Sequence, residues 1–470
     1  MKCKKLEDAL DHIDPKHIAE AAAPVKKKKK ALPWIGAAAA VLALVLAGRF
    51  IEIPMAIRAE AISLAKPQTA VRPDRDDYAN ADQWRADLDA WSAERDNRSI
   101  TAKEALAGMG DFLKKSTAAF LTGESNQLYS PINTAIGLAT VTELTAGNTR
   151  QQLLDTLGAA DTETLARYIS ALWESAYKDN GKEICTLATS LWLDDGVKFN
   201  QSVMDTLAED YYVSVYRQNL QSQKALTGIQ NWLNTNTGNL LQNSVQTLQL
   251  PQETLLALYS TIFFQAKWSE EFYEAANTQD VFHSPGGDTT VTFLNRRLKD
   301  MNYYWGDSFG AIHLSLKTGS DMWFILPDES KSVADVLAEG QYMDMILSKN
   351  RENAKFLKVN FSIPKFDVEA KKNLRDGLME MGITDLFQPG AADFSASLEA
   401  PAFFSAANQA VRVKIDETGV TAAAYIEFPA PGEAPPVERE IIDFILNRPF
   451  LFVITDRAGI PLFAGSVQQP

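Results

Sequence analysis

The chain has 470 residues, of which 46% are hydrophobic, so it can build one large core or two ordinary ones. Its formal net charge of −14 argues against nucleic-acid binding, which needs a basic surface. The two cysteines, Cys3 and Cys185, exclude a disulfide framework. With only four histidines, a Ser-His-Asp or Cys-His hydrolase is a poor hypothesis, and we expect neither a metal nor a cofactor.

The N-terminal region carries a membrane signal. Lysines fill residues 26–30, and an apolar stretch follows until Arg49. This uncharged run of about 18 residues is at the short end of what spans a bilayer, and the preceding lysines place the N-terminus inside. A cleaved signal peptide is the alternative, because Ala47 offers a small residue at a cut. We therefore predict a cytosolic basic leader over residues 1–30 and an anchor or signal sequence over 31–49.

A polar region precedes the globular part. Residues 66–100 carry charges of both signs and few aliphatic side chains, so we interpret 50–102 as a stalk or linker, or in part a solvated helix. Helical periodicity then runs through residues 105–121, 134–144, 149–157, 163–177, 203–209 and 228–241. Strand-like runs lie at residues 186–192, 255–266, 311–316, 322–326, 356–363, 411–415, 449–454 and 460–465. Helices early and strands late favour an α+β fold over βαβ units.

Near the C-terminus, a strand-like segment is followed directly by a proline-rich segment. From Val420 to Phe428 apolar residues alternate, which is the pattern of a half-buried strand. Four prolines follow within residues 429–436, and prolines hold a chain extended and outside any sheet. Gly419 and three consecutive alanines are poor choices for an ordinary strand but suit a segment that slips between two existing strands. The pattern indicates a loop that can be cut and then inserted.

Several segments resemble the serpin family, in the family's order. They are residues 130–136, 146–154, 261–272, 363–366, 381–387, 392–395, 413–424 and 444–454. Together they extend the resemblance over about 103–470 and suggest a bacterial, membrane-anchored member of the family. The resemblance implies an α+β serpin fold with about nine helices around three β-sheets, and an exposed C-terminal reactive loop over residues 417–443.

The resemblance also implies site residues. It assigns a hinge to Glu417, Thr418, Gly419, Val420, Thr421, Ala422, Ala423 and Ala424. It assigns the polar shutter and the top of the main sheet to Ser130, Asn133, Gln230, Trp268 and Gln409. Asn133, Gln409 and Gln230 stand where the family usually has serine, histidine and asparagine, and they could rebuild a hydrogen-bonded cluster. Lys365 and Arg150 are interpreted as solvated or capping side chains.

The implied function is suicide-substrate inhibition of extracellular serine, or alternatively cysteine, endopeptidases. A target protease would form an acyl-enzyme with the loop of a monomeric chain that is not itself an enzyme. One alternative is a non-inhibitory serpin that serves as a surface binding module. Another is a membrane-tethered hydrolase, which the scarcity of histidine disfavours. The protein would lie at the cell membrane as a single-pass protein with the serpin domain outside, or be secreted after signal cleavage.

The reactive bond is assigned by counting. The family's spacing from Glu417 reaches Glu433-Ala434, in the exposed stretch that follows the proline-rich stem. Bonds with a following proline are poor substrates. Glu438 and Arg439 are the next choice, and a trypsin-like target would need Arg439.

Overall fold

The computed structural model describes residues 62–65, 73–179, 184–317, 319–348, 353–420 and 440–470. The chain divides into two compact units, 1–55 and 56–470. The first unit lies outside the described residues, and with it the predicted leader and the predicted anchor over 31–49. Among the helices that are described, none is long and apolar enough to cross a membrane.

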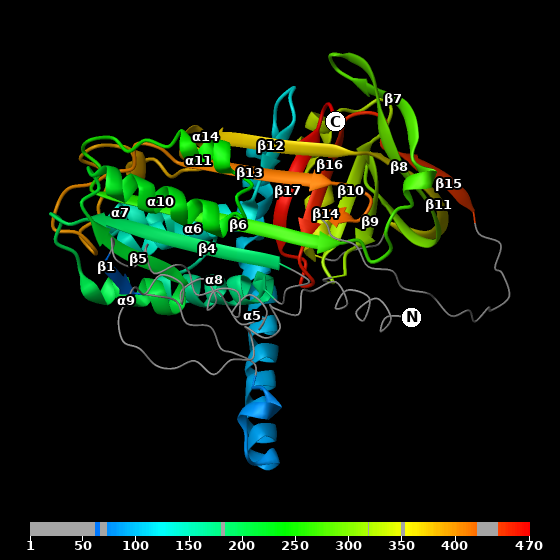
Figure 1. Ribbon diagram of the computed structural model, residues 1–470. Coiled ribbons are helices and arrows are strands. Elements are labelled where there is room, and N and C mark those ends of the chain that lie inside the picture. The colour runs from blue at the N-terminus through cyan, green and yellow to red at the C-terminus, as the bar shows by residue number, and fades with distance from the viewer. Residues whose placement is uncertain (1–61, 66–72, 180–183, 318, 349–352, 421–439) are drawn as a thin grey trace, which may run out of the picture. The chain divides into compact units, whose positions relative to one another are not determined.

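Helices and strands both contribute to the second unit (Figure 1). The helices are α5 Ala81–Leu121, α6 Pro131–Leu144, α7 Gly147–Leu157, α8 Thr162–Ala176, α9 Gln201–Asp210, α10 Gln223–Asn236, α11 Gln242–Gln246, α12 Val333–Glu339, α13 Gln341–Ser348 and α14 Arg375–Glu380. The strands are β1 Ile62–Ala65, β2 Gln127–Tyr129, β3 Lys178–Asp179, β4 Ile184–Asp194, β5 Val213–Gln218, β6 Leu256–Lys267, β7 Thr278–Ser284, β8 Gly287–Trp305, β9 Phe309–Ser315, β10 Asp321–Pro327, β11 Ala354–Pro364, β12 Phe366–Asn373, β13 Asn408–Ile415, β14 Gly419–Val420, β15 Ile441–Ile445, β16 Phe450–Thr455 and β17 Pro461–Val467.

The sheet that contains the hinge, which we call the large sheet, has the order β1-β5-β4-β6-β14-β13-β12, with β3 paired to β4. Strand β6 runs antiparallel to β4 over Ile184–Leu193, and β13 runs antiparallel to β12 along its whole length. The two-residue strand β14 lies between β6 and β13 (Figure 1). Beyond β14, β6 is therefore paired only with β4 on its other edge, and β13 only with β12, among the described residues.

The second sheet has the order β15-β11-β8-β9-β10-β16-β17-β2, with β7 paired to β8. Strand β8 is 19 residues long and pairs with β11 along one part and β9 along another. The predicted α+β fold class is confirmed. However, the two smaller sheets expected from the resemblance share β8, so hydrogen bonding joins them into one.

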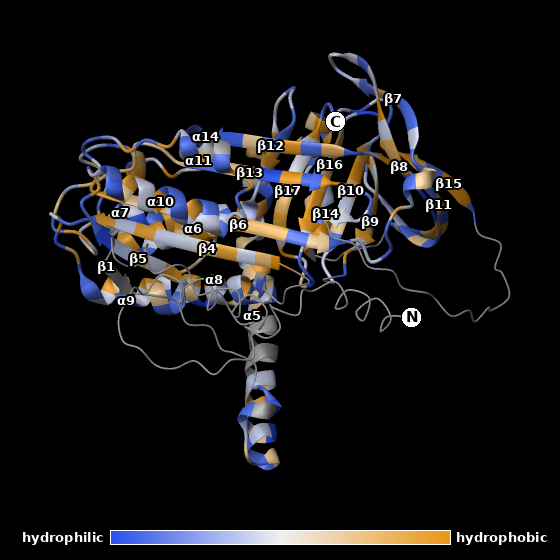
Figure 2. Cartoon of the chain, in the orientation of Figure 1, coloured by the Kyte–Doolittle hydropathy of each residue, from blue (hydrophilic) through white to orange (hydrophobic). Residues whose placement is uncertain are grey.

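The main core lies between the sheets and α6. Every residue of β16 and β17 is buried, and these strands carry apolar residues in Figure 2. Helix α6 begins at the N-cap Ser130 with Pro131 in its first turn, and most of its residues are buried. A smaller cluster of Trp192, Ile229 and Trp232 packs α10 against the large sheet. One hydrophobic cluster therefore packs α6 against the large sheet, and a separate, smaller one packs α10 against it.

Helix α5 continues through the boundary predicted between stalk and domain. It begins after the N-cap Asn80, and from Ala102 onward one face of it carries buried side chains, among them Ala105, Met109 and Leu113. Strand β1, which also lies within the predicted stalk, pairs with β5 and is the outermost strand of the large sheet. Most side chains of residues 81–93, the first turns of this helix, are exposed, which agrees with their polar composition. Part of the predicted linker therefore belongs to the fold.

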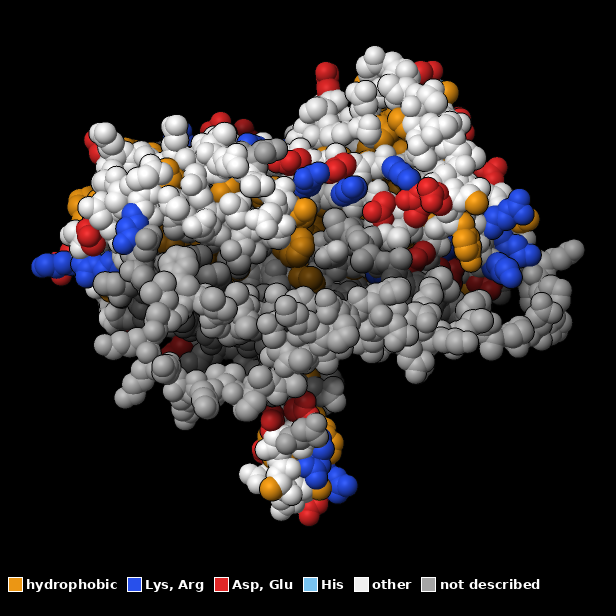
Figure 3. All heavy atoms as spheres, in the orientation of Figure 1, with side chains coloured by type: hydrophobic (Ala, Val, Ile, Leu, Met, Phe, Trp, Pro, Cys, Tyr) orange, Lys and Arg blue, Asp and Glu red, His pale blue; other side chains and the backbone are white. Residues whose placement is uncertain are grey.

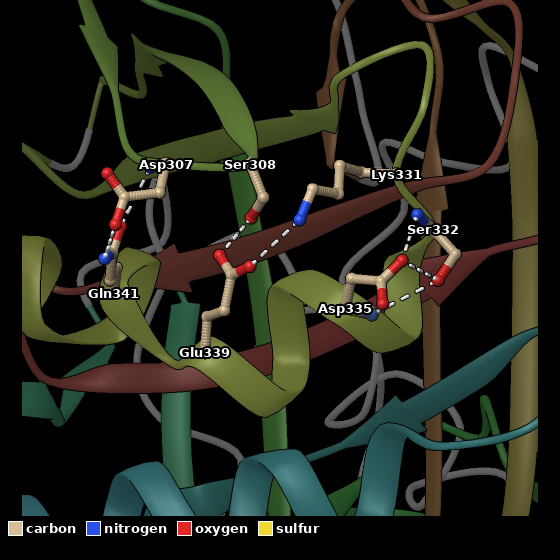
Figure 4. A network of polar contacts seen from close by, with 7 residues as sticks. All are labelled: Asp307, Ser308, Lys331, Ser332, Asp335, Glu339 and Gln341. Carbon is tan, nitrogen blue, oxygen red and sulfur yellow. Dashed lines mark hydrogen bonds and ion pairs between the residues drawn. The ribbon is translucent and has the colours of Figure 1, made fainter.

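Helix α12 is attached to the second sheet by polar contacts (Figure 4). Ser332 and Asp335 form a capping box, in which Asp335 N–H donates to Ser332 Oγ at 3.2 Å and Ser332 N–H donates to Asp335 Oδ2 at 2.8 Å. At the other end, Glu339 accepts hydrogen bonds from Ser308 and Lys331. The capping box closes the N-terminal end of α12, and Glu339 connects its C-terminal end to the residue before β9 and to the loop before the helix.

Candidate functional site

The hinge begins as a strand inside the large sheet. Gly419 pairs with Lys267 of β6, and Val420 pairs with Ala266 of β6 and with Ile415 of β13, antiparallel in each case. No pairing of β6 directly with β13 is found in the part of the chain that the structure describes. The structure thus places the predicted hinge residues Gly419 and Val420 between two long strands that run parallel to each other.

A tight turn connects β13 to β14. Asp416 Oδ1 accepts hydrogen bonds from Thr418 N–H at 3.0 Å, Thr418 Oγ1 at 2.6 Å and Gly419 N–H at 3.2 Å. An aspartate that binds its own following backbone in this way stabilises a turn. Asp416 therefore orients the hinge back along β13. No local pattern in the sequence points to this role of Asp416.

Trp268 holds the backbone of this turn. The side chain is fully buried, and its Nε1–H donates to Asp416 O at 2.9 Å. Its backbone N–H donates to Thr418 O at 3.1 Å. Phe272 packs edge-on against the indole with ring centroids 5.7 Å apart, and its N–H donates to Glu417 O at 2.8 Å. The end of β6 and the residues after it thus fix the position where the hinge enters the sheet.

Glu417 has two polar partners. It forms an ion pair with Lys365, which lies between β11 and β12, and it accepts a hydrogen bond from Asn277 Nδ2 at 2.7 Å. Burial opposes ionisation of Glu417, but the hydrogen bonds and the charge of Lys365 outweigh it, so the pKa of Glu417 lies below its usual value. Lys365, interpreted above as a solvated or capping side chain, is partly exposed but also has this ion-pair partner in the hinge. Arg150 does cap, since it donates to the carbonyls of Thr142 and Glu143.

Gly419 occupies a position with no room for a side chain. A Cβ atom there would lie 2.3 Å from Ala266 O and 2.6 Å from Lys267 Cα. Both atoms belong to the backbone of β6, which is held by β4 on its other edge. Close approach of two backbones therefore requires glycine at this point.

A polar cluster links α6 to β13. Gln409 Nε2 donates to Ser130 O at 3.1 Å and to Thr134 Oγ1 at 3.0 Å, while Ser130 N–H donates to Gln409 Oε1 at 2.8 Å. Ser130 Oγ donates to Leu462 O at 2.7 Å. Gln409 therefore satisfies both its amide oxygen and its amide nitrogen in a buried site.

The same helix end also binds β6. Asn133 Nδ2 donates to Ser260 O at 3.0 Å, and Ser260 Oγ donates to Asn133 Oδ1 at 2.5 Å. The structure thus brings the predicted residues Ser130, Asn133 and Gln409 together, and α6 contacts both strands that flank β14. Gln230 is elsewhere: it lies on α10 and donates to Val245 O at 3.2 Å. Its assignment to the cluster is not supported by this geometry.

The rest of the predicted loop cannot be placed in this site. The hinge residues Thr421, Ala422, Ala423 and Ala424 lie outside the described residues, as do the candidate reactive-bond residues Glu433, Ala434, Glu438 and Arg439. The described site therefore consists of the point where the loop leaves the sheet and of the polar cluster of Ser130, Asn133 and Gln409.

A fold with this sheet, this hinge and this cluster defines the serpin class. The family model described as Serpin (serine protease inhibitor) matches residues 111–470, so the chain belongs to the serpin family. Members of this family are mostly protease inhibitors rather than catalytic enzymes, and they inhibit target proteases through a covalent complex.

Curated relatives and solved structures agree with this assignment. The chain is 24% identical over 374 residues to Serpin-ZX of Arabidopsis thaliana, covering 76% of this chain and 95% of that protein. It is 28% identical over 357 residues to alpha-1-antiproteinase of Callosciurus caniceps, covering 74% of this chain and 84% of that one. The thermophilic serpin tengpin in its native state has a similar fold, with a TM-score of 0.70, 23% identity and coverage of 87% of this chain and all of tengpin.

Proposed function

We propose that this serpin is a suicide-substrate inhibitor of extracellular serine, or alternatively cysteine, endopeptidases. The observation that carries the proposal is the position of β14 between β6 and β13, antiparallel to both. A strand that extends from β14 along the same path would complete an antiparallel ladder on each side. The hinge is thus already aligned for insertion.

The observed register supports insertion of the small-residue face. Continued by two residues, the pairing would set Ala422 opposite Phe264 and Val413, both of which are buried. Two residues further on, Ala424 would come opposite Val411, also buried. In a strand, alternate residues share a face, so the apolar positions from Val420 onward would enter the core side of the sheet.

The free energy of insertion would drive inhibition. About a dozen inserted residues would form two ladders of hydrogen bonds at roughly 1 kcal/mol net each, and burial of the apolar face adds to this sum. The total exceeds about 10 kcal/mol. The uncleaved protein is then a kinetically held state, and loop cleavage releases it.

The covalent step is acylation of the protease without the hydrolysis that normally follows it. The protease nucleophile attacks the carbonyl carbon of Glu433 and forms an ester, or a thioester with a cysteine protease, while the amine of Ala434 leaves with the proton. Insertion then carries the bound protease along the sheet and distorts its active site before water can hydrolyse the acyl bond. The chain contributes the substrate bond and the free energy of insertion.

The polar cluster would control how fast the sheet opens. In the continued register Ile426 would come between Ser260 and Gln409. These two residues are the ones that Asn133 and Ser130 hold from α6. The insertion path therefore crosses the cluster, and the strands must separate there for the new strand to pass.

The proposal is tested by two neighbouring alanines. We expect Ala422→Arg to turn the inhibitor into a substrate, because a charged side chain would have to enter the core face. Ala423→Arg is the matched control, since position 423 would lie on the opposite face and should still allow insertion. Each variant is incubated with a panel of glutamate-specific, elastase-like, trypsin-like and papain-like proteases and run on SDS gels.

The bands distinguish the outcomes. An SDS-stable band at the summed mass for the wild type and Ala423→Arg, with only the clipped chain for Ala422→Arg, agrees with insertion. A clipped wild type without any stable band would show a non-inhibitory serpin. Mass spectrometry of the released C-terminal fragment identifies the reactive bond. A new N-terminus at Glu440 would show that the protease cuts after Arg439 and not after Glu433.

We further propose that the inhibitor acts outside the cell, either anchored through residues 31–49 or secreted after cleavage. The lysines at 26–30 and the apolar stretch after them support this placement. N-terminal sequencing of the mature protein, together with protease accessibility on intact cells, distinguishes the two forms. A full-length chain confined to the cytosol would contradict both.

A further inference from the structure

Two large apolar side chains are exposed beside the point where the reactive loop rejoins the fold. Ile441, the first residue of β15, is 61% exposed, and Phe356 of β11 is 47% exposed. Single exposed apolar residues are common on protein surfaces, but adjacent ones call for an explanation. Their position next to the loop suggests one.

The strand register places these side chains on one face. Ile441 pairs with Lys358 of β11 in parallel orientation. Phe356 precedes Lys358 by two residues and therefore lies on the same face, diagonally across from Ile441. Lys358 shares this face and is directly opposite Ile441. We call Phe356, Lys358 and Ile441 the β11–β15 patch.

Basic side chains surround the β11–β15 patch. Figure 3 shows Lys and Arg side chains gathered over β11 and β15, with hydrophobic side chains next to them. Arg297 is exposed and lies opposite Asn360, on the same face as Lys358. Lys355 forms an ion pair with Glu440, the residue where the described chain resumes after the loop. Lys358 and Arg297 thus bring two positive charges to this face, next to Asp443, which accepts a hydrogen bond from Asn360 Nδ2 at 2.8 Å.

We propose that the β11–β15 patch is a second contact surface for the target protease, in addition to the reactive loop. It fits a protease that presents apolar and acidic side chains beside its active-site cleft. The proposal rests on the inhibitory function proposed above, because only a protease that engages the loop is brought to this face.

The distance from the reactive bond supports this occupant. The peptide from Ala434 to Glu440 reaches at most about 24 Å when fully extended. A protease domain of about 250 residues has a radius of gyration of about 18 Å, so its edges extend well beyond its active site. A protease bound at Glu433 therefore lies within reach of Ile441 and Phe356. Such contacts change the rate of association rather than the outcome of insertion.

The test compares two exposed phenylalanines. Phe356→Ser removes the centre of the β11–β15 patch, and Lys358→Glu reverses its charge. Phe403→Ser is the matched control, because Phe403 is 46% exposed and lies in the segment between α14 and β13. Each variant is assayed in the full chain with a protease that forms the stable complex. The second-order rate constant of inhibition, the stoichiometry and the thermal midpoint are measured.

We expect Phe356→Ser and Lys358→Glu to lower the association rate constant by about fivefold or more, as is typical of interface residues worth 1 kcal/mol. The stoichiometry and the thermal midpoint should not change, and Phe403→Ser should match the wild type. The same protease should cleave a synthetic peptide of residues 426–440 at a rate that none of these variants can influence, which gives the contribution of the loop alone.

Three results would overturn the inference. Wild-type association rates in both patch variants would show that the protease does not touch this face. A changed stoichiometry would assign the effect to insertion instead of docking. Dimerisation of the wild type that the variants abolish, measured by light scattering, would make the patch a contact between copies of the chain. If no protease forms a stable complex, the proposed inhibitory function itself fails.

Discussion

The replacement Gly419→Ala tests the entry of the hinge most directly. The new Cβ would lie 2.3 Å from Ala266 O and 2.6 Å from Lys267 Cα, both far inside ordinary contact distance. The backbone of β6 cannot move away freely, because its other edge is bonded to β4 along Ile184–Leu193. We expect β14 to be displaced from β6 at a cost of about 1–3 kcal/mol, which is the usual range for overpacking.

That cost should appear in the partition between inhibition and cleavage. If the first pairs of the new strand form before the rest, a penalty of about 1.4 kcal/mol slows insertion about tenfold, and deacylation by water then competes. Gly419→Ala should therefore require more inhibitor molecules for each protease molecule inactivated. Titration of residual protease activity, together with the ratio of clipped to complexed chain on SDS gels, measures this stoichiometry.

Gly286→Ala provides the control. A Cβ at Gly286 would meet nothing within 4 Å, so this variant should titrate like the wild type. If Gly419→Ala also keeps the wild-type stoichiometry, close contact between β14 and β6 plays no part in inhibition, and the reasoning from the hinge position is refuted.

Three further predictions follow from the same site. Cleavage of the loop without denaturation should raise the thermal midpoint sharply in calorimetry, and equal midpoints for cut and intact protein would mean that the loop stays out. Glu417→Gln should weaken the acid dependence of stability. A carboxyl with a lowered folded-state pKa stabilises the fold fully above its unfolded value, and this contribution is lost as the pH falls through the folded-state pKa. Both proteins are compared on acidification below about pH 4.5. If the wild type loses no more stability than Glu417→Gln, the ion pair with Lys365 is contradicted. Gln409→Ala should lower the free energy of unfolding by about 2–4 kcal/mol, because it leaves buried partners of α6 unsatisfied, while Gln230→Ala should cost under about 1 kcal/mol. If urea titrations give the same loss of unfolding free energy for both variants, the hydrogen bonds of Gln409 around Ser130 do not stabilise the fold more than those of Gln230.

Most of the secondary structure could be predicted from local patterns. The alternation at 255–266 corresponds to β6, and the apolar runs at 449–454 and 460–465 correspond to β16 and β17. Strand β8 was missed because its middle carries Arg296, Arg297, Lys299 and Asp300, none of which is buried, so apolar and polar residues do not alternate regularly there. The first half of α5 was missed as part of the domain for a similar reason: a solvated helix and a linker have the same composition.

Contacts between residues distant in the sequence could not be predicted from local patterns. Gln230 and Gln409 were assigned to one cluster by resemblance alone, yet only Gln409 faces Ser130, because Gln230 lies on α10 on the other side of the sheet. The partnership of Glu417 with Lys365 and Asn277 had no signal in the sequence, since neither residue belongs to a local pattern. Such pairs depend on the sheet order, which local periodicity does not encode.

The sequence by itself determined the family and the character of the hinge. Apolar residues at alternate positions from Val420, the small residues Gly419 and 422–424, and the prolines that follow are local properties of the chain. They define a segment that can enter a sheet and a tip that cannot. Only the tertiary structure decided where that segment enters, which glycine has no room for a side chain and which side chains hold the flanking strands. These features depend on distances of a few ångströms between strands that are up to about 150 residues apart in the chain, and those distances arise only when the whole sheet is assembled.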